Sequence, residues 1–430
     1  MTDPGAERRS SELNYVAQAL EFFALMGPAE AIVHGNRRYS YAETRAAVLA
    51  MATALRAHQV HGGMTVVAMT GNHPESLILH LALHLLGCRT GFVAGQAPRR
   101  DQLGFIEQAA ADVLIHDSGV ADDLIGGALA HVPRPVLSLG AEEGRPDLLT
   151  EMVLAAAGIQ ADGEAALSAG ARVGHEPQSL FYAGHAARQP RLVLHRQPFY
   201  QALFRRGQSY RASGEPAVRH LAIQNLAATS VLIPVLLALF QGGTAILAAR
   251  PTPGRLAAII ERERVTSTTL SPLRLPDLLA EPALARADWS SLRYLNCGAT
   301  TGPPVGLMQA IERFGPVVRI VYGRTEMPLI TDYPFLVGDP AHPERLRSCG
   351  TPSGDARVEV RDVRGAVLPP GETGEIWATG SLVMAGYAGQ PELTSRALVD
   401  GWLRTGDTGY TDPDGFLYLV DRSGAGERGR

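Results

Sequence analysis

The feature that most constrains this chain is an alternation of strand-like apolar runs with helical runs, which occurs twice along the sequence. Between residues 41 and 117, a helical pattern at 41–58 is followed by strand, helix, strand, helix and strand patterns. A comparable series runs over 219–323. Strands that alternate with helices favour a parallel, doubly wound sheet. The sequence therefore predicts an α/β fold with two doubly wound parallel-sheet subdomains packed together.

The character of the sequence changes from about residue 345. Short apolar runs are separated there by the turn-forming stretches PPGETG and DPDG, which is typical of hairpins. We therefore expect a small antiparallel β-barrel-like subdomain as well. An earlier boundary falls in the Gly/Ala/Pro-rich stretch 118–178. The expected division is a first α/β subdomain, a second α/β subdomain, the β subdomain and a hinge remnant or tail: 1–175, 176–335, 336–422 and 423–430.

Charge and hydropathy exclude some classes of partner. The net charge is −4 at pH 7, with 46% apolar and 19% charged residues, which is ordinary for a globular protein. This balance gives no reason to expect nucleic acid or a membrane surface as a partner. The longest apolar run, near 226–240, contains polar residues and a proline and is too short to span a bilayer, so we expect a buried helix.

Lysine is absent, because all 39 basic residues are arginine. A genome whose base composition favours arginine codons would explain this, but the chemical consequence holds either way. No lysine ammonium, Schiff base or lysine phosphate clamp can come from this chain. The cysteines Cys88, Cys297 and Cys349 lie far apart and form no CxxC pair. They indicate a reducing, cytoplasmic setting rather than a disulfide framework.

The stretch VYGRTEM, residues 321–327, carries side chains suited to nucleotide chemistry. A strand ends there in a tight turn, and Gly323 would let the backbone approach a ligand closely. Thr325 offers a hydroxyl, and Glu326 offers a carboxylate that could hold Mg²⁺. Taken alone, the same pattern also describes an ordinary glycine-containing strand end with a capping threonine.

The stretch GWLRTGDTGYTDPDGFLYLVDR, residues 401–422, strengthens the nucleotide hypothesis. Asp407 comes at a strand end, where its carboxylate could accept two hydrogen bonds from ribose hydroxyls. The last strand closes with Asp421 and Arg422. The alternative is that Asp407 is a turn residue and that Asp421 and Arg422 form a surface pair.

Together these stretches resemble the adenylate-forming superfamily, which contains acyl-CoA synthetases, aryl-acid activating enzymes, peptide-synthetase adenylation domains and luciferases. YGRTE matches that family's YGxTE motif, and residues 401–422 match its ribose-binding and hinge motifs almost residue for residue. LRYLNCGATT resembles its SGGAP adenine loop, with Gly298 and Ala299 in register, and GETGEIWATGSLVMAGYAG also fits. The resemblance runs from about residue 20 to 422.

The resemblance implies a two-step reaction. A carboxylate attacks the α-phosphate of ATP to give acyl-AMP and pyrophosphate, and a thiol of CoA or of a carrier-protein phosphopantetheine then takes the acyl group. It also implies that Tyr322 stacks on adenine, that Asp407 holds the ribose and that Arg422 contacts the ribose from the hinge. Thr325 would contact the α-phosphate, and Glu326 would bind Mg²⁺. The nucleotide-binding residues implied in this way are Gly298, Ala299, Thr300, Tyr322, Gly323, Thr325, Asp407 and Arg422, and the catalytic residues are Thr325, Glu326 and Arg191.

One departure from the family concerns its phosphate loop. LFYAGHAARQPRLVLH, residues 180–195, has a strand–turn–strand pattern and aligns with the family's YTSGTTGxPKG loop, but it keeps only Tyr182 and Pro190. Such loops bind through glycines, hydroxyls and exposed N–H groups. Alanine, glycine, histidine and arginine replace those residues, and arginine replaces the lysine. Guanidinium groups bind phosphate bidentately. The loop is therefore either repurposed or has lost its pyrophosphate function, and its candidate anion-binding residues are His185, Arg188 and Arg191.

The other departure lies at the end of the sequence. In the family, a small C-terminal domain that carries the adenylation lysine follows the hinge, which here is Asp421–Arg422, whereas this sequence stops at Arg430. A shortened piece of a longer protein or a naturally truncated protein would account for this, and the tail SGAGERGR favours the second. We expect the chain alone to be impaired in adenylation.

The acyl pocket is expected between the helix start at 225–230, Gly298 and the turn at Tyr322 and Gly323, with Asn225 and Thr229 among its lining residues. Amino-acid activators carry an aspartate near the helix start, and IQNLAATS has no acid there. This resembles aryl-acid activators more closely. The alternative for Asn225 is a helix cap.

Two functions stay open at the level of sequence. The first is an AMP-dependent enzyme, or its N-terminal domain, that activates a small aryl or acyl carboxylic acid with ATP and Mg²⁺ and passes it to CoA or to an acyl or peptidyl carrier protein. The alternative is a non-adenylating descendant. It would serve as an acyl-binding or scaffold module, or as a transferase that uses a pre-activated acyl donor.

Overall fold

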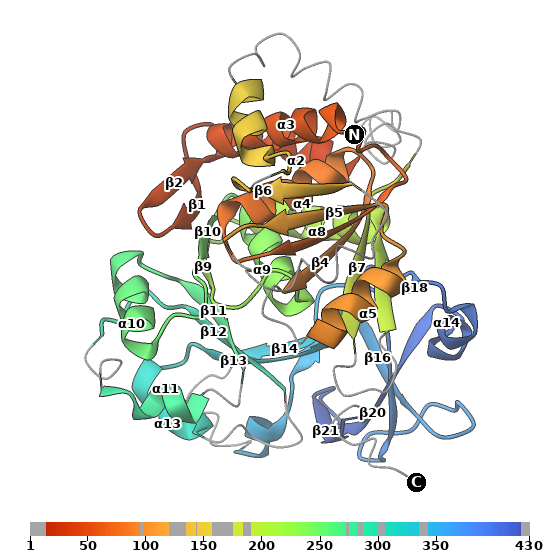
Figure 1. The fold of residues 1–430 in the computed structure, drawn as a ribbon. Helices are drawn as coiled ribbons and strands as arrows, with labels where there is room; N and C mark the ends of the chain where they lie inside the picture. The colour runs from red at the N-terminus through yellow and green to blue at the C-terminus, as the bar shows by residue number, and fades with distance from the viewer. Residues whose placement is uncertain are drawn as a thin grey trace, which may run out of the picture. The chain divides into compact units, whose positions relative to one another are not determined.

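The computed structural model describes the following residues: 14–94, 99–119, 135–142, 144–156, 175–183, 191–271, 275–282, 287–299, 306–334 and 343–422. Figure 1 shows the described helices and strands, coloured by residue number along the chain. Internal contacts divide the chain into two compact units, each built from segments that alternate along the sequence. Unit 1 comprises Met1–Tyr182, Leu192–Ala217 and Gln224–Ala249. Unit 2 comprises Ala183–Arg191, Val218–Ile223 and Arg250–Arg430. The four-part division expected from the sequence stays a prediction.

Unit 1 contains a mostly parallel sheet with the strand order β8-β7-β4-β3-β5-β6. Strand β3 pairs in parallel with β4 on one side and β5 on the other. The predicted strands on either side of the 184–190 turn are confirmed as β7 and β8, and the turn itself lies outside the described residues. The bounds are β3 (Thr65–Thr70), β4 (Arg89–Ala94), β5 (Val113–Asp117), β6 (Val136–Leu139), β7 (Gln178–Ala183) and β8 (Arg191–Arg196).

Three further strands of unit 1 pair with one another. Strand β1 (Glu30–His34) is parallel to β10 (Thr244–Leu247) and antiparallel to β2 (Arg37–Ser40). The unit therefore mixes parallel and antiparallel pairs, although parallel pairs predominate. This confirms the α/β class and adds an antiparallel edge that the alternation of helices and strands does not predict.

The helices of unit 1 begin and end where local chemistry favours it. Helix α3 starts with a capping box, in which Ser40 and Glu43 satisfy each other's backbone N–H groups. Helix α4 has proline in its first turn and is buried along its whole length. Gly87 follows it with a φ of +76°, where a Cβ atom would lie 2.4 Å from the carbonyl oxygen of His175. The bounds are α2 (Tyr15–Met26), α3 (Tyr41–Ala57), α4 (Pro74–Leu85), α5 (Arg99–Ala109), α8 (Gln197–Ala212) and α9 (Thr229–Phe240).

Unit 2 contains the second mostly parallel sheet, with the strand order β15-β14-β13-β12-β11-β9. Strands β9, β11, β12 and β13 are parallel, and β14 and β15 add antiparallel pairs. The bounds are β9 (Arg219–Ala222), β11 (Ser267–Leu270), β12 (Tyr294–Gly298), β13 (Val318–Arg324), β14 (Met327–Pro334) and β15 (Thr351–Pro352). The helices of this part are α10 (Pro253–Arg262), α11 (Leu275–Ala280), α13 (Leu307–Phe314) and η2 (Pro343–Arg347).

The small β subdomain predicted after residue 345 is confirmed as a curled antiparallel sheet. Its strand order is β16-β17-β20-β19, and β21 pairs with the long strand β20. The bounds are β16 (Arg357–Arg361), β17 (Gly374–Thr379), β18 (Gly386–Tyr387), α14 (Pro391–Ala397), β19 (Leu398–Val399), β20 (Trp402–Thr411) and β21 (Leu417–Asp421). Strand β20 contains Asp407, so this sheet fixes the position of one of the candidate site residues.

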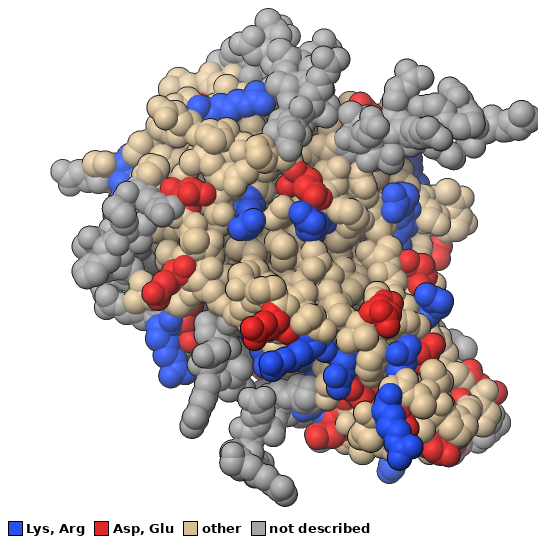
Figure 2. Space-filling model, turned by 90° about the vertical axis from the view of Figure 1, so that its right-hand side faces the viewer, with Lys and Arg blue, Asp and Glu red and all other residues tan. Residues whose placement is uncertain are grey.

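Two surface properties bear on partners. Figure 2 shows a face on which arginine and acidic side chains of the described residues are interspersed, without a large area of one sign. Among the described helices, none combines the length and the apolar character that a membrane crossing requires. The apolar run near 226–240 forms α9, a twelve-residue helix with Pro234 in its interior.

Candidate functional site

The YGRTE stretch forms a hairpin between β13 and β14. Arg324 pairs with Met327, so Thr325 and Glu326 are the two residues of the turn, and the register shifts just before it. The prediction that a strand ends here in a tight turn is confirmed. Thr325 is half-buried and Glu326 is buried, so the hairpin carries its acidic side chain inward.

Gly323 is required by this hairpin itself. A Cβ atom added there would lie 2.0 Å from the carbonyl oxygen of Pro328 on β14, which no real side chain tolerates. We expected this glycine to let the backbone approach a ligand. The close approach in the structure is that of the neighbouring strand, so the glycine has a structural reason that the sequence does not reveal.

Asp407 is the centre of the polar cluster in unit 2. Its side chain is 0% exposed, and burying a carboxylate requires hydrogen-bond donors and opposite charge. The hydroxyl of Tyr322 donates to Oδ2 at 2.8 Å, and Nη1 of Arg324 donates to Oδ1 at 2.8 Å. Burial, and then the charge of Asp407, raises the pKa of Tyr322 above its ordinary value, so the phenol keeps the proton that it donates.

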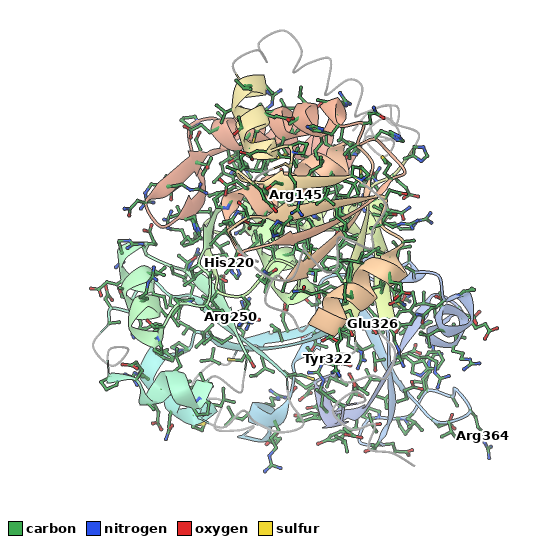
Figure 3. The ribbon with its side chains drawn as sticks, in the orientation of Figure 1. Arg145, His220, Arg250, Tyr322, Glu326 and Arg364 are labelled. Carbon is green, nitrogen blue, oxygen red and sulfur yellow. The ribbon has the colours of Figure 1, made fainter. Side chains whose placement is uncertain are left out.

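Glu326 forms the second acidic position of the cluster. Its Oε1 accepts a hydrogen bond of 2.8 Å from the hydroxyl of Tyr387 on β18. Its backbone carbonyl accepts one of 2.8 Å from the N–H of Met384. The guanidinium of Arg191 lies 6.0 Å from the ring centroid of Tyr387, close enough for a cation–π contact. Figure 3 labels Tyr322 and Glu326, which belong to the same hairpin region.

Arg422, the last described residue of the chain, is bonded to the cluster through its side chain. Its Nη1 donates to the carbonyl oxygen of Ala299 at 2.8 Å, and its Nη2 donates to that of Gly323 at 3.3 Å. Its guanidinium carbon lies 5.6 Å from the ring centroid of Tyr322, and its Nε lies 4.0 Å from Asp407. The alternative of a surface pair with Asp421 is therefore wrong, because Arg422 bonds to two backbone carbonyls of unit 2.

The stretch that resembles the adenine loop lies beside the hairpin. Gly298, the last residue of β12, pairs with Val321 of β13, and the N–H of Ala299 donates to the carbonyl oxygen of Val321 at 2.8 Å. Seven predicted nucleotide-site positions therefore lie in or beside this hairpin of unit 2: Gly298, Ala299, Tyr322, Gly323, Thr325, Asp407 and Arg422. Thr300, a further one, lies outside the described residues, as do His185 and Arg188.

Arg324 and Tyr387 are site residues that the sequence reasoning missed. Arg324 lies between Asp407 and Glu326, with its Nε 3.6 Å from Oε2 of Glu326. Burial opposes its charge, but Glu326 and Asp407 together raise the pKa of the guanidinium. The sequence feature that could have pointed to Arg324 is its place at the variable position of the YGxTE motif, directly before Thr325 and Glu326. Tyr387 stands in the quoted stretch that also resembled the family, but no local pattern marks it as a partner of Glu326.

The residues predicted for an acyl pocket fall in both units. Asn225 and Thr229 belong to unit 1, whereas Gly298, Tyr322 and Gly323 belong to unit 2, so the pocket stays a prediction. The amide of Asn225 donates to the carbonyl oxygen of Thr70 at 2.9 Å, and its Oδ1 accepts from the N–H of Ala227. The helix-cap alternative is wrong, because Ala228 precedes the first turn of α9.

The described residues do not form a site for a resident metal ion. No group of three or more histidine, cysteine, aspartate or glutamate side chains in the described part of the chain could hold one. Mg²⁺ is usually held by one or two carboxylates together with substrate phosphates. The predicted ligand, Glu326, accepts from Tyr387 and has the Arg324 guanidinium 3.6 Å away. The fit of Mg²⁺ to these residues alone is therefore poor.

Comparison with known proteins identifies the family. The family described as AMP-binding enzyme matches residues 23–388. The feruloyl-CoA synthase of an Amycolatopsis species is 32% identical over 422 residues, which are 93% of this chain and 77% of that protein. The medium/long-chain-fatty-acid–CoA ligase FadD8 of Mycobacterium tuberculosis is 44% identical over 183 residues, which are 42% of this chain and 32% of that protein. Among solved structures, the amide bond synthetase McbA from Marinactinospora thermotolerans matches with a TM-score of 0.80 and 28% identity, over 95% of this chain and 79% of that one.

The chain belongs to the AMP-binding enzyme family, the adenylate-forming enzymes that resemble acyl-CoA ligases. The predicted resemblance is thereby confirmed at the level of the family. The roles of individual residues, the state of the phosphate loop and the acid that is bound remain proposals.

Proposed function

We propose that this chain binds an adenylate and acts on an aryl or acyl carboxylic acid, with CoA or a carrier-protein thiol as the acceptor. The observation that carries the proposal is the meeting of the buried Tyr322 and Asp407 with the partly exposed Arg422 in one cluster. These residues come from the two stretches with the closest resemblance to the family's motifs, and membership of the AMP-binding enzyme family supports their assignment to the nucleoside.

In this proposal the residues of unit 2 bind and orient the nucleoside half of the ligand. Asp407 has a carboxylate that can accept more than two hydrogen bonds. Because it is 0% exposed beneath Tyr322 and Arg324, ribose hydroxyls would reach it once one of these two side chains moves aside. Arg422 fixes the carbonyl oxygens of Ala299 and Gly323. It thereby fixes the position of the adenine-loop stretch relative to the hairpin.

We further propose that this chain alone adenylates slowly. No hydroxyl side chain is present between Ala183 and Arg191, where the family's phosphate loop has several, and no lysine is present anywhere in the sequence. A preorganised charge at a developing oxyanion contributes roughly 10²–10³ in rate. Losing such donors would lower turnover while leaving nucleoside binding in place.

The test is pyrophosphate–ATP exchange with a panel of carboxylic acids, run beside a calorimetric titration with AMP. We expect AMP to bind and exchange to be very slow. Exchange at the rates of active family members would refute the impairment. Loss of such exchange in Arg191→Ala, with AMP binding unchanged, would then show that arginine does the work of the loop.

The substrate class rests on the segment before α9. IQNLAATS offers no carboxylate to pair with an ammonium group, and the named relatives act on feruloyl and fatty acyl groups. We therefore expect aromatic or apolar acids to raise the melting temperature in the presence of AMP, and free α-amino acids to have little effect. A preference for a zwitterionic amino acid would overturn this assignment.

A second candidate function is supported by the same loop. A chain that binds an acyl adenylate or another activated acyl donor without making it would be a transferase or an acyl-binding module. AMP binding together with no exchange for any acid, and acyl transfer from a supplied acyl-AMP to a thiol, would favour the transferase.

A further inference from the structure

Arg324 is placed between the two buried acids of the site. Its guanidinium donates through Nη1 to Asp407 at 2.8 Å, and its Nε lies 3.6 Å from Glu326. The side chains of Asp407 and Glu326 are 0% and 5% exposed, and that of Arg324 is 19% exposed. Two buried carboxylates at these distances need opposite charge, and the arginine supplies it from within the same hairpin.

The charges of this cluster balance within unit 2. Asp407 and Glu326 contribute two negative charges, and Arg324 and Arg422, each within 4.0 Å of one of these carboxylates, contribute two positive ones, whereas Arg191 lies further out, over the ring of Tyr387. A divalent cation added beside Glu326 would face the guanidinium of Arg324 at short range, and the described residues offer no alternative group of ligands. A phosphate group would instead meet a cluster without net charge.

We propose that Arg324 is the charge-balancing residue of this site and fills the place of a divalent cation between Asp407 and Glu326. It also positions the Asp407 carboxylate. This inference rests on the proposed function for the identity of its ligand, an adenylate. It goes beyond that function by assigning a residue that decides how strongly the ligand's phosphate and a divalent cation are bound.

The first experiment compares the affinities of AMP and adenosine by calorimetry without divalent ions. In Arg324→Met the cluster acquires one net negative charge. The affinity for AMP should therefore fall roughly tenfold more than the affinity for adenosine, as expected for one charge at an intermediate effective dielectric. A merely structural role would weaken both ligands alike. Arg324→Lys restores the charge and should restore the preference.

The matched control is Arg319→Met on the same strand. Arg319 lies over the ring of Tyr294, with its guanidinium carbon 4.3 Å from the ring centroid, and belongs to no part of the site. It should keep the parental ratio of the two affinities. Should Arg324→Met fail to fold, Arg324→Gln takes its place, because its amide can still donate to Asp407 without carrying charge.

The second experiment needs no nucleotide. Mn²⁺, titrated alone and followed by electron paramagnetic resonance, should bind Arg324→Met on the order of tenfold more tightly than the parent, Arg324→Lys or Arg319→Met. Equal Mn²⁺ affinity in all four proteins would overturn the inference, whatever AMP does. If no variant binds AMP or adenosine, the proposed function fails, and the Mn²⁺ titration still decides the role of Arg324.

Discussion

Tyr322 and Asp407 are 85 residues apart in the chain, and the phenol of the first donates a hydrogen bond of 2.8 Å to the carboxylate of the second. This bond joins the YGRTE hairpin to the long strand of the antiparallel sheet. Because both side chains are buried, the pair also holds two elements of unit 2 together. Binding and stability therefore depend on the same contact.

Replacing Asp407 by alanine should make the binding free energy of AMP or of an acyl-AMP mimic less favourable by about 1–3 kcal/mol, because charged hydrogen bonds to the ligand are lost. Calorimetry at fixed ionic strength measures the change. Asp421→Ala is the matched control, since Asp421 is an exposed aspartate on the adjoining strand. Equal affinity of the Asp407 variant and the parent would remove this residue from the nucleoside site.

Replacing Tyr387 by phenylalanine removes only the hydroxyl that donates to Glu326 at 2.8 Å. The free energy of unfolding should fall by roughly 1–3 kcal/mol, because a buried carboxylate loses a donor. Tyr410→Phe is the comparison, since the Tyr410 ring stacks on that of Tyr418. Urea unfolding that gave the same loss for both variants would contradict a special role for the Tyr387 hydroxyl.

The pKa of His73 is raised to about 9. Burial opposes its charge, but Asp117 at 2.5 Å and Glu75 at 2.9 Å outweigh the cost. A raised histidine pKa contributes stability that is complete below about pH 6.5 and is lost as the pH rises through 9. The free energy of unfolding should therefore fall by up to about 3 kcal/mol over that window, at 1.36 kcal/mol per unit.

Urea unfolding from pH 6 to 9.5 measures this loss. His73→Gln should be less stable at pH 6 and should show a much flatter dependence on pH. The exposed His61, changed to Gln, serves as the control and should keep the parental profile. A parental profile that is itself flat above pH 7 would show that His73 is not held as a cation.

His80 is buried in α4, and among the described residues neither of its ring nitrogens has a hydrogen-bond partner. Burial lowers its pKa to about 3. Stability is then lost as the pH falls below about 6.5, where the unfolded chain takes up a proton that the folded chain refuses. His80→Leu should raise the free energy of unfolding at pH 7 by roughly 1–3 kcal/mol, because two unpaired polar atoms leave the core.

The comparison for this change is His220→Leu. His220 is equally buried with a pKa lowered to about 4, but its Nδ1 lies 3.0 Å from the hydroxyl of Ser267. In both variants the free energy of unfolding should fall less between pH 7 and acid pH than it does in the parent. At pH 7 itself, only His220→Leu should be less stable than the parent. A destabilised His80→Leu would mean that the imidazole fits its surroundings better than its unpaired atoms indicate.

The parts of the fold that depend on local pattern could be predicted from the sequence. The helix at 41–58 and the strands on either side of the 184–190 turn follow apolar periodicity, which is a property of neighbouring residues. The interleaving of the two units depends on contacts between segments that are far apart in sequence, and no local signal reports it. The same limit explains the site. The aspartate at 407 could be found from its motif, whereas its bonds to Tyr322 and Arg324 depend on the packing of two strands, β13 and β20, that are far apart in the sequence.

The role of Asn225 illustrates a further limit. Its position before a helix is compatible with a cap, a pocket residue or a turn, and these differ by shifts of a few residues in the start of α9. The structure resolves them through the hydrogen bonds to Thr70 and Ala227. Element boundaries are the least certain part of any prediction from periodicity, so roles that depend on them are the first to change.

The interleaved segments have a consequence for synthesis on the ribosome. Unit 1 is complete in sequence only when Ala249 has been made, and by then β9, which belongs to unit 2, has already been synthesised. Its parallel partner β11 begins at Ser267. During that interval β9 is a strand with exposed backbone groups on the side that β11 later covers, so a nascent chain stalled between these two points offers an edge for chaperones to protect or for aggregation to exploit.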